Sequence, residues 1–365
     1  MSRDAAACAE TRADALRGFL RATGWGGARL APLAGDASAR RYLRLTGGPG
    51  DAGAVLMDAD PAAGEDVRPF AALTGWLRAQ GFSAPDILAA DAEAGFLLLE
   101  DFGDALVSRV CAADPAAEAP LYEAAVDLLA ALAAIPPPET AIGHGCAHAV
   151  PPYDAATLLR EARLATDWWA AGAEVGLSPD ALAEFDAKLT AACAAAAEAR
   201  STLALRDYHA DNLIWLPDRR GLARVGLLDH QDALRGAPAY DLISLLEDAR
   251  RDVSPDLRMA MAARFAGALK ARDPGFDAEA FAAQAAALAA QRNLKIVGIF
   301  ARLALRDGKP GYLALIPRVW AHLSRDLTHP DLQALAAFVA RHLPEPTPQR
   351  LARVAAAAGR GAPTA

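Results

Sequence analysis

The sequence contains few cysteines, and they show no paired spacing. Only four occur among the 365 residues: Cys8, Cys111, Cys146 and Cys193. A disulfide framework or a structural zinc site requires paired or clustered cysteines, so neither is indicated. Unpaired cysteines of this kind are typical of a reducing compartment.

Positive charge and long apolar runs are also scarce. The chain carries 37 Lys and Arg against 45 Asp and Glu, a formal net charge of -8, and it has no basic tract. Because nucleic-acid binding needs clustered positive charge, no nucleic acid is expected as the main partner. No apolar run reaches the roughly 18 residues of a membrane span, and Glu10 and Asp14 interrupt the N-terminal segment. We therefore expect no membrane span and no signal peptide, and a cytoplasmic protein.

Apolar residues are abundant by contrast. They make up 53% of a chain that is longer than one ordinary core requires, so the composition predicts two lobes. Alanine accounts for much of this share and favours helices.

One polar pattern stands out against this background. Asp207 is followed at the fifth position by Asn212, and Asp229 comes later, directly after the apolar pair Leu227-Leu228. A carboxylate and an amide can hold Mg²⁺ beside phosphate oxygens, while a second carboxylate deprotonates an acceptor hydroxyl. The pattern therefore indicates phosphoryl transfer.

Each of these residues also fits a structural role when taken alone. Asp and Asn are common in turns, where their side chains bond to the backbone, and Asp229 could simply end a buried strand. The two segments occur in the order that a kinase requires, however, and the run 217–221 between them has the composition of a hairpin turn. Together they favour a kinase-type site.

The spacing resembles the catalytic loop of the protein-kinase-like superfamily. Leu205 stands where protein kinases have His, and His230-Gln231 follow Asp229 where protein kinases have Phe-Gly, so the resemblance is closer to the aminoglycoside-phosphotransferase branch. It implies an α+β, bilobal protein-kinase-like fold with a small β-rich N-lobe and a larger, mostly helical C-lobe. It also implies ATP and Mg²⁺ as cofactors, Asp207 as catalytic base, and Asn212 and Asp229 as metal ligands.

The residue pattern before residue 103 agrees with a β-rich lobe. It predicts helices over 5–23 and 65–80 and strands over 29–33, 40–45, 54–58 and 95–103. The small-residue turn Gly35-Asp36-Ala37-Ser38 could bring backbone N–H groups and Ser38 close to a nucleotide phosphate, although the turn taken alone is better explained as a hairpin turn without a ligand.

The resemblance leaves one position of this lobe unfilled. Where the third strand of a kinase carries a phosphate-binding Lys, this chain has Met57 or Asp58. Nearby cations could replace the lysine, and the candidates are Arg40, Arg41 and Arg44. Glu65, the usual partner of that Lys, is then expected to be a plain helix-start carboxylate.

The strand that ends at residues 100–103 leads to the hinge of the family. The resemblance implies that the main chain of Glu100, Asp101 and Phe102 contacts the adenine. The lobes are accordingly predicted as 1–103, which binds nucleotide, and 104–365, which carries the catalytic and substrate-binding residues.

The remainder of the chain is predicted to be helical. The expected helices cover 121–135, 153–172, 181–200, 281–306, 312–327 and 351–358. A loop is expected over 139–153 and a strand over 203–205. Asp241 is expected to cap its helix and to bond to the loop that contains Asp207. The charged run 247–252 is expected to be a solvated helix end, with a substrate rim as the alternative.

Several strings narrow the resemblance. The segments 35–42, 207–212 and 228–233, and the run Gln291-Arg292-Asn293-Leu294-Lys295, resemble bacterial kinases of cell-wall recycling. Those enzymes phosphorylate the C1 hydroxyl of N-acetylmuramate and N-acetylglucosamine. The resemblance implies a small amino-sugar substrate, whose lactyl carboxylate would meet one of Arg160, Arg163, Arg250 or Arg292. The other polar groups of the sugar would meet Glu161, Asp232 or Asn293.

Two other functions remain open at this point. A net negative charge also suits a kinase of cationic aminoglycosides or of other small molecules. The missing third-strand Lys favours a nucleotide-binding pseudokinase, whereas the presence of Asp207, Asn212 and Asp229 favours an enzyme. Nothing in the sequence indicates an oligomeric state.

Overall fold

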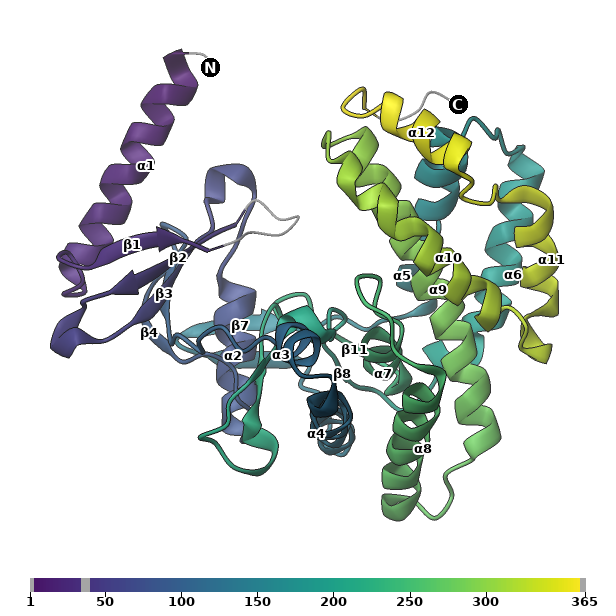
Figure 1. Ribbon diagram of the computed structural model, residues 1–365, viewed down its shortest axis with the longest axis horizontal. Helices are drawn as coiled ribbons and strands as arrows, with labels where there is room; N and C mark the ends of the chain where they lie inside the picture. The colour runs from purple at the N-terminus through teal and green to yellow at the C-terminus, as the bar shows by residue number, and fades with distance from the viewer. Residues whose placement is uncertain (1–2, 34–39, 362–365) are drawn as a thin grey trace. The chain divides into compact units, whose positions relative to one another are not determined.

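A computed structural model describes residues 3–33 and 40–361, and it divides into two compact units (Figure 1). The N-terminal unit comprises Met1–Arg109, Glu139–Ala149 and Asp211–Asp232. The C-terminal unit comprises Val110–Pro138, Val150–Ala210 and Ala233–Ala365. The first change of unit lies close to the boundary expected near residue 103, but two later segments return to the N-terminal unit.

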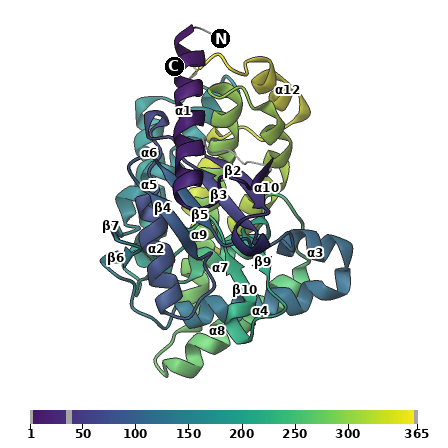
Figure 2. The ribbon, with the colours of Figure 1, turned by 90° about the vertical axis from the view of Figure 1, so that its left-hand side faces the viewer.

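A five-stranded antiparallel sheet forms the centre of the N-terminal unit, with strand order β1-β2-β3-β5-β4. The strands are β1 (Arg29–Pro32), β2 (Arg41–Thr46), β3 (Ala54–Asp58), β4 (Ile87–Asp91) and β5 (Phe96–Leu99). Helices α1 (Arg3–Ala22) and α2 (Arg68–Ala79) belong to the same unit, and both are visible with the sheet in Figure 2. All the elements predicted before residue 103 are present, and β4 is additional.

The period-two pattern of the strands explains why both faces of this sheet are covered. Leu56 and Leu98 point to one face, where they pack in one cluster with Phe19 of α1. Met57 and Leu97, which are adjacent to Leu56 and Leu98 in the two strands, point to the other face and pack with Phe70 of α2. Burial of these side chains on both faces stabilises a sheet whose strands are only four to six residues long.

The segment expected to be a loop over 139–153 contains a hairpin instead. Strands β6 (Thr140–Gly143) and β7 (Cys146–Ala149) pair in antiparallel fashion, and the turn residues His144 and Gly145 both have positive φ, 48° and 74°. Two consecutive left-handed residues make the turn that matches the twist of two-residue hairpins. The hairpin packs on α2 so closely that a Cβ on Gly75 would lie 2.4 Å from the Cα of Gly143.

A second hairpin completes the N-terminal unit and carries two of the predicted site residues. It consists of β9 (Leu213–Trp215) and β10 (Val225–Leu227), paired in antiparallel fashion. The turn predicted over 217–221 connects them and is therefore confirmed. Gly226 has no room for a side chain, because a Cβ would lie 2.8 Å from the ring of Phe102.

The C-terminal unit is mostly helical, which confirms the predicted α+β class with a larger helical part. Its short strands are β8 (Thr202–Ala204) and β11 (Leu234–Gly236), which pair with each other. The helices are α3 (Val107–Ala113), which begins in the N-terminal unit, α4 (Glu118–Leu132), α5 (Ala155–Ala162), α6 (Pro179–Ala197), α7 (Ala239–Leu246), α8 (Pro255–Arg272), α9 (Ala278–Leu305), α10 (Ile316–Asp326), α11 (Gln333–His342) and α12 (Pro348–Ala356).

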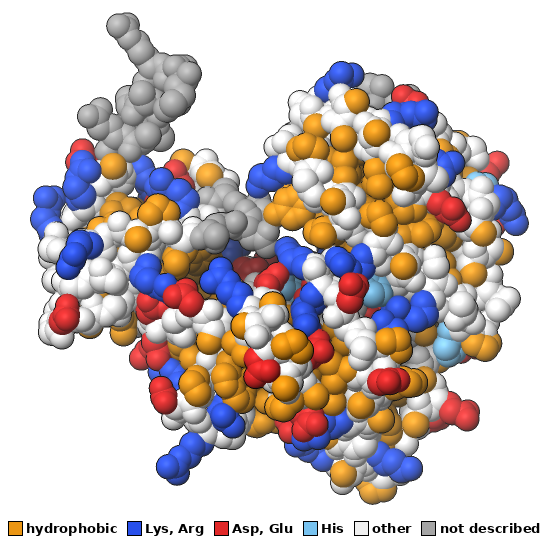
Figure 3. Space-filling view, in the orientation of Figure 1, with side chains coloured by type: hydrophobic (Ala, Val, Ile, Leu, Met, Phe, Trp, Pro, Cys, Tyr) orange, Lys and Arg blue, Asp and Glu red, His pale blue; other side chains and the backbone are white. Residues whose placement is uncertain are grey.

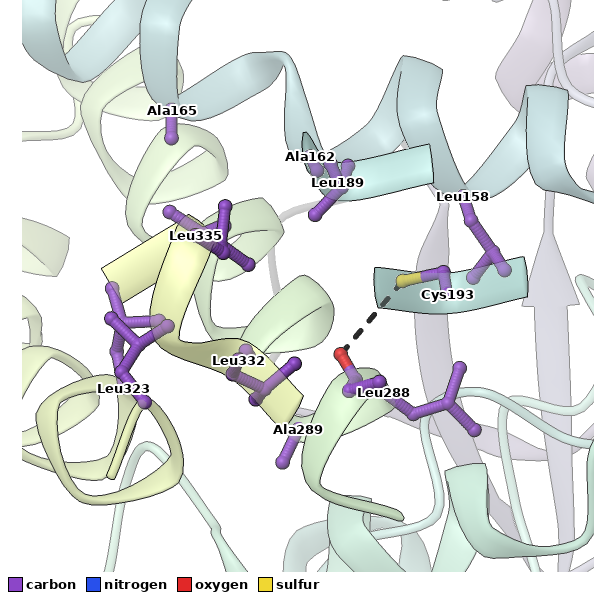
Figure 4. Packing of buried hydrophobic residues seen from close by; sticks show 14 of the residues in the cluster. Leu158, Ala162, Ala165, Leu189, Cys193, Leu288, Ala289, Leu323, Leu332 and Leu335 are labelled. Atoms are coloured by element: carbon purple, nitrogen blue, oxygen red, sulfur yellow. Dashed lines mark hydrogen bonds between the residues drawn. The ribbon is translucent and has the colours of Figure 1, made fainter. Parts of the chain in front are cut away.

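Helix α9 runs through the core of this unit. Leu288 and Ala289 pack with residues of α5, α6, α10 and α11 in the cluster that Figure 4 shows, where the Sγ of Cys193 lies 3.9 Å from the carbonyl oxygen of Ala287. At Gly298 the same helix meets the backbone before the π-helical turn Ala165–Ala170, and a Cβ there would lie 2.1 Å from the carbonyl carbon of Leu164. The buried run 291–295 of α9 carries the polar residues that matter below.

Candidate active site

The loop that carries Asp207 is held by hydrogen bonds within the C-terminal unit. It follows β8, and the N–H of Asp207 donates to the carbonyl oxygen of Leu205 at 2.9 Å. The next residue, Tyr208, is buried and donates its hydroxyl to the carbonyl oxygen of Ala125 in α4 at 2.9 Å. Residues 205–210, which we call the Asp207 loop, are therefore held against the helices of their own unit.

Asp241 bonds to the Asp207 loop as expected. Its carboxylate accepts from the N–H of Leu205 at 2.6 Å and from the N–H of Arg206 at 2.8 Å. Arg206 has a φ of 72°, which is costly for a residue with a side chain, so these two bonds stabilise an otherwise disfavoured backbone. Burial raises the pKa of Asp241 to about 7. The expected helix cap is wrong, however, because Asp241 lies inside the first turn of α7, and the N-cap residue Pro238 provides no side-chain cap.

Positive charge surrounds Asp207. Burial alone would raise the pKa of its carboxyl, but the charges of Lys295, His209, Arg206 and Arg292 outweigh burial and lower that pKa. The carboxylate form, which can accept a proton from a hydroxyl, is thus the stable form near neutral pH.

Glu161 has a different environment from the one expected for a substrate contact. One carboxylate oxygen pairs with Arg206, while the other lies 3.1 Å from Lys295 Nζ and accepts from the hydroxyl of Tyr153. Only 13% of its side chain is exposed. Because both oxygens are bound within the protein, the structure favours a supporting role for Glu161.

Asn212 and Asp229 lie at the same end of the second hairpin of the N-terminal unit. Leu213 pairs with Leu227 in the ladder, and the carbonyl oxygen of Asn212 accepts from the N–H of Leu228 at 3.0 Å. Residues on either side of that bond are neighbours across the hairpin, so the register brings the amide and the carboxylate to one end. Asp229 has a φ of 55° and a side chain that is 42% exposed.

The donor set at this end suits a hard divalent cation. Asn supplies a neutral oxygen and Asp a charged one, and Mg²⁺ prefers oxygen ligands. Because the protein would supply only these two ligands, the other coordination sites of the ion would be open to phosphate and water. Gln231 donates its amide to Asp229 Oδ1 at 2.8 Å and thereby orients the carboxylate. Asp232, two residues further on than His230, is exposed and lies 3.4 Å from the same Gln231 amide.

Arg40 is the arginine that lies next to Glu65 and Asp229. Its Nε lies 2.8 Å from Glu65 Oε2, and its Nη1 lies 3.5 Å from Asp229 Oδ1. Glu65 is therefore not the plain helix-start carboxylate that we expected, because it pairs with Arg40 and precedes α2 rather than lying in it. Sequence spacing missed this pair because the cation comes from the residue before β2, whereas the family places it on the third strand.

The other two arginine candidates are engaged elsewhere in the N-terminal unit. Arg41 pairs with Asp58, one of the two residues at the expected lysine position. Arg44 lies 2.7 Å from both Asp101 and Asp104. The predicted nucleotide contact Ser38 lies outside the described residues.

The expected hinge residues form a compact polar group. The N–H of Glu100 donates to the carbonyl oxygen of Asp86 at 2.8 Å, and its carboxylate accepts from Arg219. The same guanidinium lies 4.9 Å from the ring centroid of Phe102, which in turn packs on Gly226. Phe102 and Glu100 are thereby fixed beside the hairpin that holds Asp229.

The run 247–252 is not the solvated helix end that we expected. Asp248 is 2% exposed, and Glu247 is 9% exposed and bonds to Arg325 and to the amide of Asn293. Arg250 Nη1 lies 3.5 Å from Nε2 of His209, two residues after Asp207. Burial lowers the pKa of His209, and the charge of Arg250 acts in the same direction.

Asn293 joins two carboxylates in the core of the C-terminal unit. Its amide lies 2.8 Å from Glu247 and 2.8 Å from Asp326. Burial and the neighbouring Glu247 raise the pKa of Asp326 to about 8. Asn293 itself is fully buried, which makes a supporting role more plausible for it than a direct substrate contact.

Comparison with known proteins agrees with the motif. The model of the phosphotransferase enzyme family matches residues 29–282. The chain belongs to this family. It is a phosphotransferase, and its residues 207–229 lie inside the matched region.

Two curated relatives are similar over almost the whole chain. The N-acetylmuramate/N-acetylglucosamine kinase of Caulobacter vibrioides is 42% identical over 357 residues, which cover 90% of this chain and 96% of the relative. The kinase of the same name from Pseudomonas aeruginosa is 36% identical and covers 87% of this chain and 91% of the relative.

Solved structures with low identity share the fold. An ethanolamine kinase from Plasmodium vivax has a TM-score of 0.56 at 10% identity. The matched region covers 87% of this phosphotransferase and 86% of the ethanolamine kinase chain. The GDP complex of an aminoglycoside 2'-phosphotransferase has a TM-score of 0.52 at 13% identity and covers 82% and 92%. The predicted kinase-like fold is thus confirmed.

Two further features concern the apolarity of the helices and the charge of the surface. Among the helices within residues 3–33 and 40–361, none combines the length and apolarity that a membrane crossing requires. On the face seen in Figure 3, acidic and basic side chains are interspersed rather than gathered into one basic patch.

Proposed function

We propose that this phosphotransferase transfers the γ-phosphoryl group of ATP to the C1 hydroxyl of N-acetylmuramate, N-acetylglucosamine or both. The observation that carries the proposal is the 42% identity over 90% of the chain to a kinase named for these two sugars. The retained set of Asp207, Asn212 and Asp229 supports an active enzyme rather than a pseudokinase.

Asp207 is the base in this proposal. Its carboxylate accepts the proton of the C1 hydroxyl as the sugar oxygen bonds to the γ-phosphorus and the bond from that phosphorus to the leaving ADP oxygen breaks. A hemiacetal hydroxyl is more acidic than an ordinary alcohol, so a carboxylate with a lowered pKa suffices for a late proton transfer.

Asn212 and Asp229 would hold Mg²⁺, which neutralises charge on the phosphates of the nucleotide. Arg40 would contribute a further positive charge toward those phosphates, since it is held by Glu65 and lies 3.5 Å from Asp229. The main chain of Glu100 and Phe102 would receive the adenine, and Arg44 would support that segment through Asp101.

The lactyl carboxylate of N-acetylmuramate needs a cation, and four arginines are candidates. Arg163 pairs with Asp186, and Arg160 contacts Thr157 of α5. Arg292 is buried and donates to Ser244. Arg250 is the candidate that we propose, because its Nη1 lies 3.5 Å from Nε2 of His209 in the Asp207 loop. Asp232 is the candidate for the sugar hydroxyls.

The proposal is tested with a panel of acceptors that contains both amino sugars, glucose and kanamycin. ADP release is measured with each acceptor for the wild type, for Asp207→Asn and for the exposed loop control Asp218→Asn. The proposal predicts turnover on an N-acetylated amino sugar that is lost in Asp207→Asn and kept in Asp218→Asn. Turnover on kanamycin without any turnover on sugars would instead establish an antibiotic kinase, and nucleotide binding without turnover would establish a pseudokinase.

A further inference from the structure

A lysine lies at the centre of a buried charged cluster beneath the Asp207 loop. Lys295 belongs to the buried run of α9, and 10% of its side chain is exposed. Its Nζ lies 3.1 Å from Glu161 Oε2 of α5 and 3.3 Å from the hydroxyl of Tyr240 in α7. Three helices of the C-terminal unit therefore meet at one ammonium group.

Glu161 connects this ammonium to the Asp207 loop. Its second oxygen pairs with the guanidinium of Arg206, the residue directly before Asp207. The backbone of Arg206 is held as well, because its N–H donates to Asp241 and its carbonyl oxygen accepts from Ser244 at 3.2 Å. A residue with a left-handed backbone is thus fixed through its side chain and through both of its peptide groups.

The charged groups around Asp207 come from three elements. Arg206 and His209 belong to the loop itself, Lys295 and Arg292 belong to α9, and the carboxyl group of Asp241 belongs to α7. Burial raises the pKa of Asp207, and Lys295 makes the largest contribution among the groups that lower it. Glu161 responds in the same way: burial would raise the pKa of its carboxyl, and Lys295 is the first of the charges that lower it.

We propose that Lys295 is a positioning residue for phosphoryl transfer, which orients Arg206 through Glu161 and supplies the positive charge that faces the carboxylate of Asp207. This inference rests on the proposed role of Asp207 as base. A buried ion pair that only fills the core is the simpler alternative, and it predicts a loss of stability without a change in the pH dependence of the reaction.

The decisive experiment compares the pH profile of kcat in the wild type, Lys295→Met and Lys295→Arg. Removal of the charge favours the protonated form of Asp207, so the acid limb of the Lys295→Met profile moves to higher pH. At pH values below the apparent pKa of the base, each pH unit by which the limb moves lowers kcat about tenfold. The loss of kcat is therefore larger at about pH 5.5 than at about pH 8. Lys295→Arg keeps the charge and retains the wild-type profile, and the KM for ATP stays within about twofold in both variants.

Two further variants keep the result interpretable. Arg302→Met removes a cation from the same helix, away from the cluster, and leaves the profile unchanged. Glu161→Gln breaks the link to Arg206 and lowers kcat. In the double variant Glu161→Gln/Lys295→Met, the fold loss in kcat is smaller than the product of the fold losses in the two single variants. An equal fractional loss at every pH in folded Lys295→Met, or an acid-side loss in Lys295→Arg, overturns the inference.

This comparison is separate from the test of the proposed function. If the wild type phosphorylates another hydroxyl compound but no amino sugar, the proposed substrate is wrong, and the Lys295 profiles are measured with that compound. An unchanged acid limb in Lys295→Met, in an enzyme that does phosphorylate amino sugars, rejects the positioning role alone.

Discussion

Replacement of Arg40 by alanine should weaken ATP binding far more than replacement of Arg41, the next residue of this segment. Arg40 pairs with Glu65 at 2.8 Å, and the two side chains are only 12% and 17% exposed. A charge-assisted contact to a phosphate in such surroundings contributes about 1.5 to 3 kcal/mol, which corresponds to a rise of roughly 10- to 150-fold in the KM for ATP.

The same substitution leaves Glu65 without its cation. Loss of one partner of a partly buried pair costs about 1 to 3 kcal/mol, so the free energy of unfolding should fall by a similar amount. Glu65→Ala separates the two effects, because it lowers stability while the positive charge of Arg40 remains for the phosphates. Its KM for ATP should therefore rise less than that of Arg40→Ala.

The assay measures the KM for ATP at saturating sugar, direct nucleotide affinity by calorimetry, and stability by urea denaturation. Arg41→Ala is the matched control, since that side chain pairs with Asp58. An Arg40→Ala enzyme with a KM for ATP within about twofold of the wild type, or an equal rise in Arg41→Ala, would refute the assignment.

Three further outcomes follow from the same structure. Asp207→Asn should lower kcat by at least about 100-fold while nucleotide affinity is kept, and a smaller loss would show that another group accepts the proton. Asp229→Asn should raise the Mg²⁺ concentration for half-maximal activity by about tenfold or more, as should Asn212→Ala, whereas unchanged titrations would place the metal elsewhere. Because the pKa of Asp326 is raised to about 8, folding is favoured by its proton at low pH, and this contribution is lost as the pH rises through that value. Asp326→Asn should therefore reduce the fall in unfolding free energy between about pH 6 and about pH 9, by roughly 1 to 3 kcal/mol, and an unchanged fall in urea denaturation would contradict the raised pKa.

Local patterns in the sequence were sufficient for the sheet and for most helices. The strand geometry of residues 54–58 places Leu56 and Met57 on opposite faces, and both are buried because each face packs against a helix. The bond from Asp241 to the Asp207 loop was also predictable, because the family motif specifies it. The hairpin over Thr140–Ala149 was missed, since a single His-Gly pair in a Gly- and Pro-rich stretch is a weak turn signal.

Partners that are distant in the sequence could not be predicted in this way. Glu161 has the sequence environment of an exposed helix carboxylate, yet its partners Arg206 and Lys295 lie 45 residues or more away along the chain. Hydrophobic periodicity predicts which face of a helix is buried, but it does not predict which charged residue of a neighbouring helix contacts that face. The same limit explains why the pair of Arg40 with Glu65 emerged only from the structure.

The most direct test of the proposed function is the position of the new phosphate on the sugar. Incubation with ATP and Mg²⁺, followed by phosphorus NMR coupled to the sugar protons, identifies the carbon that carries it. We predict a phosphate on C1 of N-acetylmuramate or N-acetylglucosamine, formed by the wild type and not by Asp207→Asn. A phosphate on C6, or no phosphorylated amino sugar beside an active kinase reaction on another acceptor, would contradict the account.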